Sequence, residues 1–145
     1  MGARVFQGFH TILVAWDGSP QAEHALEVAL SLASSTKASV LVFAVVRPPE
    51  PAESAELNAV LEDARERYER SFVTMREHAN EVGVELKTEI AVGHPAEQII
   101  HRAETAQASL IVMGRRSHTV FHRWMLGSNS ERVVRSAYCP VMVVH

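Results

Sequence analysis

The chain has 145 residues, of which 47% are hydrophobic and 21% charged, a composition typical of one globular domain with a single core. Its 14 basic and 17 acidic side chains give a net charge of -3, which provides no electrostatic signal for binding nucleic acid or an anionic membrane. The single cysteine, Cys139, excludes an intrachain disulfide, and no apolar run approaches the ~20 residues that span a bilayer. We therefore expect one cytoplasmic domain over residues 1–145, with no nucleic-acid or membrane partner.

The first third of the chain predicts a strand, a helix and a second strand. Residues 11–16, TILVAW, form a short continuous apolar run, which is typical of a strand covered on both faces. The segment DGSP ends this run, and Ser19 and Pro20 suit the cap and the first turn of a helix. Alanines and leucines then recur at helical spacing, with Leu32 among the expected buried positions. Residues 39–46, SVLVFAVV, predict a second buried strand.

The middle of the chain opens with a proline-rich loop, RPPEPAES, because proline neither donates to a sheet nor continues a helix. Residues 55–82 then predict one long helix, which ends at Gly83. Residues 84–92 alternate apolar and charged side chains, which indicates a half-exposed strand at the edge of a sheet. A turn at Gly93 precedes another predicted helix, which begins at Pro95.

The last third predicts a buried strand over residues 109–114, a helix over 128–136 and a final strand over 140–144. Strands that alternate with helices predict a parallel sheet with right-handed crossovers. The expected fold class is therefore α/β: a Rossmann-like three-layer sandwich in which helices cover both faces of a five-stranded parallel sheet.

In such a sheet, ligands bind beyond the carboxyl ends of the strands, where the strand order reverses. Gly114 lets the chain turn sharply as it leaves its strand. Gly127 and Ser128 then open the last predicted helix, whose first backbone N–H groups favour an anion. On this interpretation Ser128, Asn129 and Ser130 present amides and hydroxyls to phosphates.

A second interpretation of the same helix start needs no ligand. Ser128 and Glu131 have the spacing of a capping box, in which the two side chains satisfy the N–H groups of the helix end. The two common nucleotide motifs, G-x-x-x-x-G-K-[ST] and G-x-G-x-x-G, are both absent from the sequence. Spacing alone therefore leaves the anion site and the simple helix cap as alternatives.

Three segments taken together resemble the universal stress protein family. They are ILVAWDGSPQAEHAL, GHPAEQII and SLIVMGRRSHTVFHRWMLGSNSERVVRSAYCPVMVV, in this order between residues 11 and 144. Each segment alone is a weak signal, but the three together are specific. The resemblance implies a strand order of 3-2-1-4-5, which places the first and fourth strands side by side at the switch point. It also implies a homodimer formed through the last strand, Pro140–Val144.

The resemblance further implies an adenine nucleotide, since nucleotide-binding members carry G-x-x-G-(x9)-G-[ST] and hold ATP there. This chain keeps Gly114 and the pair Gly127-Ser128 at the required spacing, but Ser117 replaces the second glycine. Serine is strained there if the position needs a positive φ, and fits if only close approach is needed. Arg115 and Arg116 either bind phosphate oxygens or point to solvent.

Other site residues come from the resemblance one position at a time. Asp17 matches an acidic residue that lies against the nucleoside, although a turn or a helix cap also explains a carboxylate there. Ala15 and Val45 match positions that contact adenine, and Val45 also suits the core. Met113, which precedes Gly114, is assigned to the same nucleotide site.

The predicted function is that of an ATP-binding stress or signalling protein with little or no hydrolysis, because no residue can be named as the base. Magnesium or manganese would accompany the phosphates, but no protein cluster demands a metal, and His118 and His122 lack the glutamate and third ligand of a zinc site. The alternative is a dimeric interaction module of the same family that binds no nucleotide. An ATP-using transferase or ligase is disfavoured, since DGSP is too short for its phosphate loop.

Overall fold

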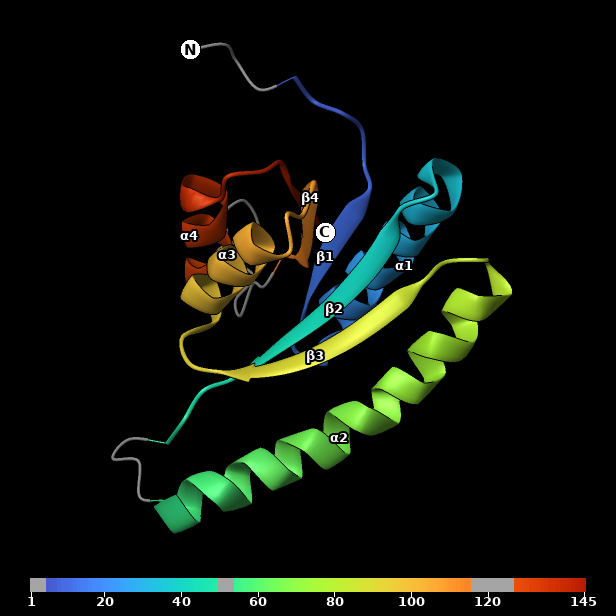
Figure 1. Cartoon of the computed structure of the whole chain (residues 1–145). Helices are drawn as coiled ribbons and strands as arrows, with labels where there is room; N and C mark the ends of the chain where they lie inside the picture. The colour runs from blue at the N-terminus through green and yellow to red at the C-terminus, as the bar shows by residue number, and fades with distance from the viewer. Residues whose placement is uncertain (1–4, 50–53, 116–126) are drawn as a thin grey trace.

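The computed structural model describes residues 5–49, 54–115 and 127–145. Its sheet contains five strands in the order β3-β2-β1-β4-β5, and every neighbouring pair is parallel. Figure 1 shows the sheet with its helices. The elements in chain order are β1 (Thr11–Trp16), α1 (Pro20–Thr36), β2 (Ser39–Val46), α2 (Ser54–Glu81), β3 (Leu86–Val92), α3 (Pro95–Thr105), β4 (Leu110–Gly114), α4 (Ser128–Ser136) and β5 (Val141–Val144). The predicted fold class and strand order are both confirmed.

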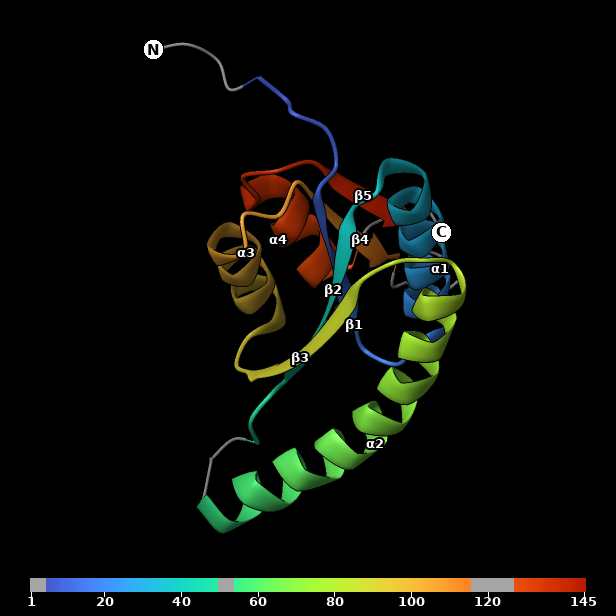
Figure 2. The same cartoon turned by 45° about the vertical axis from the view of Figure 1, so that its right-hand side comes forward.

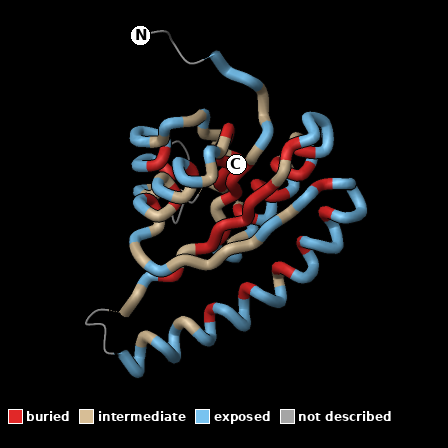
Figure 3. The backbone as a smooth tube through the Cα atoms, viewed as in Figure 1, coloured by how far each residue is buried: buried red, intermediate tan, exposed pale blue. Residues whose placement is uncertain are grey.

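The helices form two layers, with α1 and α2 on one face of the sheet and α3 and α4 on the other (Figure 2). Each face has its own apolar core. Alternate residues of β1 divide between the two cores, since Val14 packs toward α1 and Leu13 packs toward α3. Burial is therefore continuous along the central strands, whereas α2 buries only a stripe (Figure 3). Both faces of the central strands are covered, which explains their continuous apolar runs.

Three details differ from the sequence expectation. The third strand begins at Leu86, because Val84 is buried in the preceding turn and donates its N–H to the carbonyl of Ala79 at 2.9 Å. On α1, Leu30 lies in the core, whereas Leu32 is only partly buried. The fourth and fifth strands each begin one residue later than expected, as is usual at element ends. The edge position predicted for the third strand is confirmed.

At the amino ends of the strands, one hydroxyl joins β1 to β4. The Ser109 side chain is buried, and its Oγ accepts hydrogen bonds from the backbone N–H groups of His10 (3.0 Å) and Thr11 (3.2 Å). The same hydroxyl donates to the carbonyl of Thr11 at 3.0 Å. The backbone N–H of Ser39 extends this network to β2 by donating to the carbonyl of His10 at 3.0 Å. At the amino ends of these strands, the polar groups of Ser109, His10 and Thr11 are therefore satisfied by hydrogen bonds within the chain.

A charged pair joins the edge strand β3 to α3. Arg102 donates to both carboxylate oxygens of Glu89, each at 2.6 Å. The hydrogen bonds from Arg102 lower the pKa of Glu89, and those with Glu89 raise the pKa of Arg102. The pair is partly exposed, lies away from the switch point and links β3 to α3.

Candidate functional site

A cavity of about 560 Å³ lies at the carboxyl ends of β1, β2 and β4. Its position matches the rule that open parallel sheets bind ligands at the switch in strand order, which here falls between β1 and β4. Nine of the predicted site residues line it. They are Ala15, Asp17, Val45, Met113, Gly114, Gly127, Ser128, Asn129 and Ser130. The structure thus brings together positions that lie up to 115 residues apart, from Ala15 to Ser130.

The three remaining predicted residues are consecutive: Arg115, Arg116 and Ser117. Arg115 is not among the described residues that line the cavity, and its Nη1 lies 3.3 Å from Nδ1 of His145. Its backbone N–H donates to the carbonyl of Val144 at 2.7 Å, which continues the pairing of β4 with β5. Arg116 and Ser117 lie outside the described residues, so their predicted roles stay predictions.

The turn between β1 and α1 forms one wall of the cavity. Asp17 accepts a hydrogen bond at Oδ1 from the backbone N–H of Ser19, at 2.9 Å. Ser19 in turn caps α1, since its Oγ accepts from the N–H of Ala22 at 3.1 Å. Between them Gly18 has a φ of +79°, a conformation that favours glycine. Asp17 therefore fills the turn role, and the cap predicted for Ser19 is confirmed.

The start of α4 lacks such a side-chain cap. The cap residue is Gly127, one position earlier than the capping box requires, and within the described residues this position makes no side-chain cap hydrogen bond. Ser128 is the first helical residue, and the Glu131 carboxylate instead accepts from Arg135 at 2.7 Å. The capping-box interpretation is therefore wrong. Because the first N–H groups of a helix have no partner within it, this helix start remains suited to an anion.

Gly114 has a steric role in place of the expected conformational one. It is not among the glycines with positive φ. A Cβ added there would lie 2.6 Å from the carbonyl carbon and oxygen of Gln21, in the first turns of α1. Only glycine lets the end of β4 approach α1 this closely, and this approach defines the floor of the cavity.

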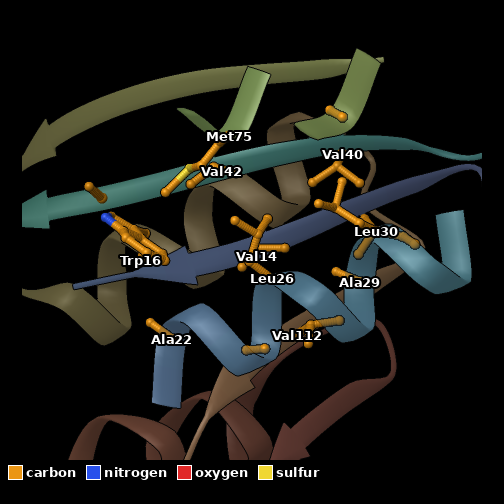
Figure 4. Close-up of a cluster of buried hydrophobic side chains, with 14 of the residues drawn as sticks. Val14, Trp16, Ala22, Leu26, Ala29, Leu30, Val40, Val42, Met75 and Val112 are labelled. Atoms are coloured by element: carbon orange, nitrogen blue, oxygen red, sulfur yellow. The ribbon is translucent and has the colours of Figure 1, made fainter. Parts of the chain in front are cut away.

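Trp16 is a cavity residue that the sequence analysis missed. The side chain is only 5% exposed, and its indole Nε1 is buried with no hydrogen-bond partner. Figure 4 shows the ring at the carboxyl end of β1, with its nitrogen turned toward the carboxyl end of β2. A buried donor without an acceptor is costly, so such groups are rare in folded proteins. The sequence did contain one signal for Trp16, since it is the last residue of a predicted strand and ligands bind at strand ends.

Arg47 and Tyr68 also line the cavity and were also missed. Arg47 directly follows β2, so the same rule of strand ends identifies it in retrospect. Tyr68 comes from the middle of α2, and its ring lies 4.0 Å from the position of a Cβ added to Gly18. Nothing in the sequence places this tyrosine beside the first turn, because the contact depends on how α2 crosses the sheet.

Several candidates fall away from the cavity. Within the described residues there is no group of three or more histidine, cysteine or acidic side chains that could hold a metal, and His118 and His122 lie outside those residues. Cys139 is a free, partly buried thiol whose pKa is raised by burial, so it is not an activated nucleophile. Among the described helices, none is long and apolar enough to cross a membrane.

The chain belongs to the universal stress protein family. The family model matches residues 8–145. The chain is similar to a universal stress protein of Methanocaldococcus jannaschii, with 34% identity over 140 residues that cover 94% of this chain and 82% of the relative.

Solved structures agree with this membership. A family member from Burkholderia pseudomallei is 30% identical, with a TM-score of 0.77 and coverage of 94% of this chain and 96% of that one. A universal stress protein from Archaeoglobus fulgidus was solved in complex with dAMP. It has a TM-score of 0.69 and covers 94% of this chain and 98% of that chain. Its identity to this chain is only 22%, so this likeness shows the fold alone.

Proposed function

We propose that this protein binds an adenine nucleotide, with ATP as the first candidate, and acts in stress response or signalling. The phosphates lie at the start of α4, against the amides of Ser128, Asn129 and Ser130. The nucleoside lies over the ends of β1 and β2, beside Ala15 and Val45. The observation that carries the proposal is the cavity itself, which is large enough for a nucleotide and is bounded by a helix start whose cap residue is a glycine.

The same arrangement supports binding with little or no hydrolysis. Asp17 is the carboxylate among the described lining residues, and its Oδ1 already accepts the N–H of Ser19. A base that positions an attacking water needs an acceptor directed at the terminal phosphate. A magnesium or manganese ion would be held by phosphate oxygens and water, so it would enter with the nucleotide and contribute to binding.

The test begins with nucleotide release. The purified protein is denatured, and any released nucleotide is identified by chromatography. ATP is then titrated calorimetrically against the wild type and Gly127→Trp, whose indole would occupy the space in front of the α4 amides. We expect affinity to fall at least about tenfold, because direct contacts of the phosphates with this helix end are lost.

Ser136→Trp provides the matched control, since it adds the same side chain at the exposed, opposite end of α4. This variant should bind ATP like the wild type. No binding by the wild type at millimolar ATP, or equal binding by Gly127→Trp, would contradict the proposal.

A second function, pairing between copies of the chain, is favoured by the edge strand β5. Its hydrogen bonds to β4 use the carbonyls of Pro140 and Val144. In a parallel ladder the alternate residues Val141 and Val143 therefore direct their N–H and C=O groups to the open edge, which can pair with a second copy. Val143→Pro removes an outward N–H, so sedimentation should show a monomer. A dimer that persists in this variant would exclude pairing through β5.

A further inference from the structure

The cavity has a second charged end, formed by Arg47. This arginine directly follows β2 and lines the cavity with its side chain exposed. Within the described parts of the chain, no side chain forms an ion pair or hydrogen bond with it. Pro48 follows immediately, and its fixed φ restricts how the chain leaves the strand. The result is a cation at the rim of the cavity that no described side chain neutralises.

Arg47 and Gly114 lie at the ends of strands on opposite sides of β1, and both line the cavity together with the start of α4. The strand order places β2 on one side of β1 and β4 on the other, and α4 is the helix that follows β4. Because neighbouring strands lie about 4.8 Å apart, the ends of β2 and β4 are separated by roughly 10 Å. A single phosphate chain bound at α4 does not also reach Arg47 when a nucleoside lies between them.

The groups between these two ends favour a neutral part of a ligand. Asp17 follows β1, between the two anion-binding ends, and its carboxylate would repel a phosphate placed over it. Beside it, the buried and unpartnered indole N–H of Trp16 has its nitrogen turned toward the end of β2, the side of Arg47 (Figure 4). The β2 side of the cavity thus offers two hydrogen-bond donors, Arg47 and the Trp16 N–H.

We propose that Arg47 determines ligand specificity by binding a second phosphate group, so that the cavity prefers a nucleoside phosphorylated at two separate positions. One phosphate lies at the start of α4, the neutral nucleoside lies over Asp17, and the second phosphate lies against the guanidinium of Arg47. This inference rests on the proposed nucleotide binding. Arginine suits the role, because its planar donors bind phosphate bidentately.

The test compares AMP with adenosine 3′,5′-bisphosphate, two probes that differ only in the second phosphate. Calorimetry on the full chain measures each dissociation constant for the wild type, Arg47→Ala and Arg47→Lys. The bisphosphate should bind the wild type about tenfold more tightly than AMP does, as expected for a charge-assisted contact. This preference should fall to near onefold in Arg47→Ala and be partly retained in Arg47→Lys, which keeps the charge but loses the fork.

Arg65→Ala is the matched control, since it removes the same charge from an exposed position of α2 and should leave the preference unchanged. Raising the ionic strength should weaken the preference in the wild type but not in Arg47→Ala. If both probes bind and their ratio is the same with and without Arg47, the inference is overturned and nucleotide binding stands. If neither probe nor ATP binds, the proposed function fails, and the inference fails with it.

Discussion

The amino ends and the carboxyl ends of the strands, called here the amino edge and the carboxyl edge, are built in opposite ways. At the amino edge the Ser109 hydroxyl makes three hydrogen bonds, which join the beginnings of β1 and β4. At the carboxyl edge the same two strands end at a cavity of about 560 Å³, beside the buried Trp16 N–H that has no partner. The Ser109 hydroxyl at one end is satisfied by the chain, whereas the buried Trp16 N–H at the other has no acceptor among the described residues. The difference indicates that the first edge stabilises the fold and the second receives a ligand.

The two helices that begin at the cavity repeat this contrast on a smaller scale. The start of α1 is capped by Ser19, whereas α4 begins at Gly127 with no side-chain cap. A cap satisfies helix N–H groups that would otherwise bind water or an anion. Helix α1 therefore satisfies part of its first turn with its own cap, whereas the glycine that begins α4 has no side chain to do so. Substitutions at each edge can test whether stability and binding separate in this way.

The largest effect on stability is expected at Gly114. Gly114→Ala places a Cβ against the backbone of Gln21, at 2.6 Å, and backbone cannot rotate away as a side chain can. Strand and helix must move apart, so we expect about 3 kcal/mol of destabilisation in urea unfolding. The control is Gly8→Ala, which meets nothing within 4 Å but has a φ of +87°, and should cost only about 1 kcal/mol. Equal costs would show that β4 does not need this close approach.

The amino edge is tested by Ser109→Ala. The variant removes the serine hydroxyl from the part-buried N–H groups of His10 and Thr11 and from the Thr11 carbonyl, so unfolding should become easier by about 2 kcal/mol. Nucleotide affinity should not change, because this hydroxyl lies at the opposite edge from the cavity. Ser39→Ala is the control at the same edge, since its exposed hydroxyl makes one long bond of 3.4 Å, and about 0.5 kcal/mol or less is expected. Weaker binding in Ser109→Ala would contradict the separation of the two edges.

The helix starts are compared by Ser19→Ala and Ser128→Ala. The first variant removes a cap and should destabilise the protein by about 1 kcal/mol. The second removes an exposed hydroxyl that caps nothing and should leave stability unchanged within about 0.5 kcal/mol. Thermal unfolding of both variants without nucleotide measures the difference. A similar loss in Ser128→Ala would restore the capping-box interpretation of this helix.

The sequence predicted most of the fold, since each central strand is an apolar run and each helix carries a periodic stripe. The rule of strand ends also predicted where the cavity lies, and the family resemblance predicted nine of its lining residues, but Trp16 and Arg47 at the ends of β1 and β2 were missed. Prediction failed where distant elements meet. Tyr68 reaches the cavity through the packing of α2, and Gly114 is required by the backbone of Gln21. Neither contact leaves a local pattern, and the choice between cap and anion site depended on a helix start that shifted by one residue.

A small effect on stability but a clear effect on binding is expected for Trp16→Phe. Phenylalanine removes the unpartnered N–H, which favours folding, but fills less space in a buried site, which opposes it. These terms offset each other, so unfolding without ligand should change by no more than about 1 kcal/mol. If the N–H is kept for a ligand, Trp16→Phe should lower nucleotide affinity several-fold. Combining it with Arg47→Ala, which removes the second phosphate site, should cause no further loss of affinity. A loss of stability above about 2 kcal/mol, with binding intact, would show that Trp16 stabilises the fold, as Ser109 does at the amino ends of the strands, and does not serve a ligand.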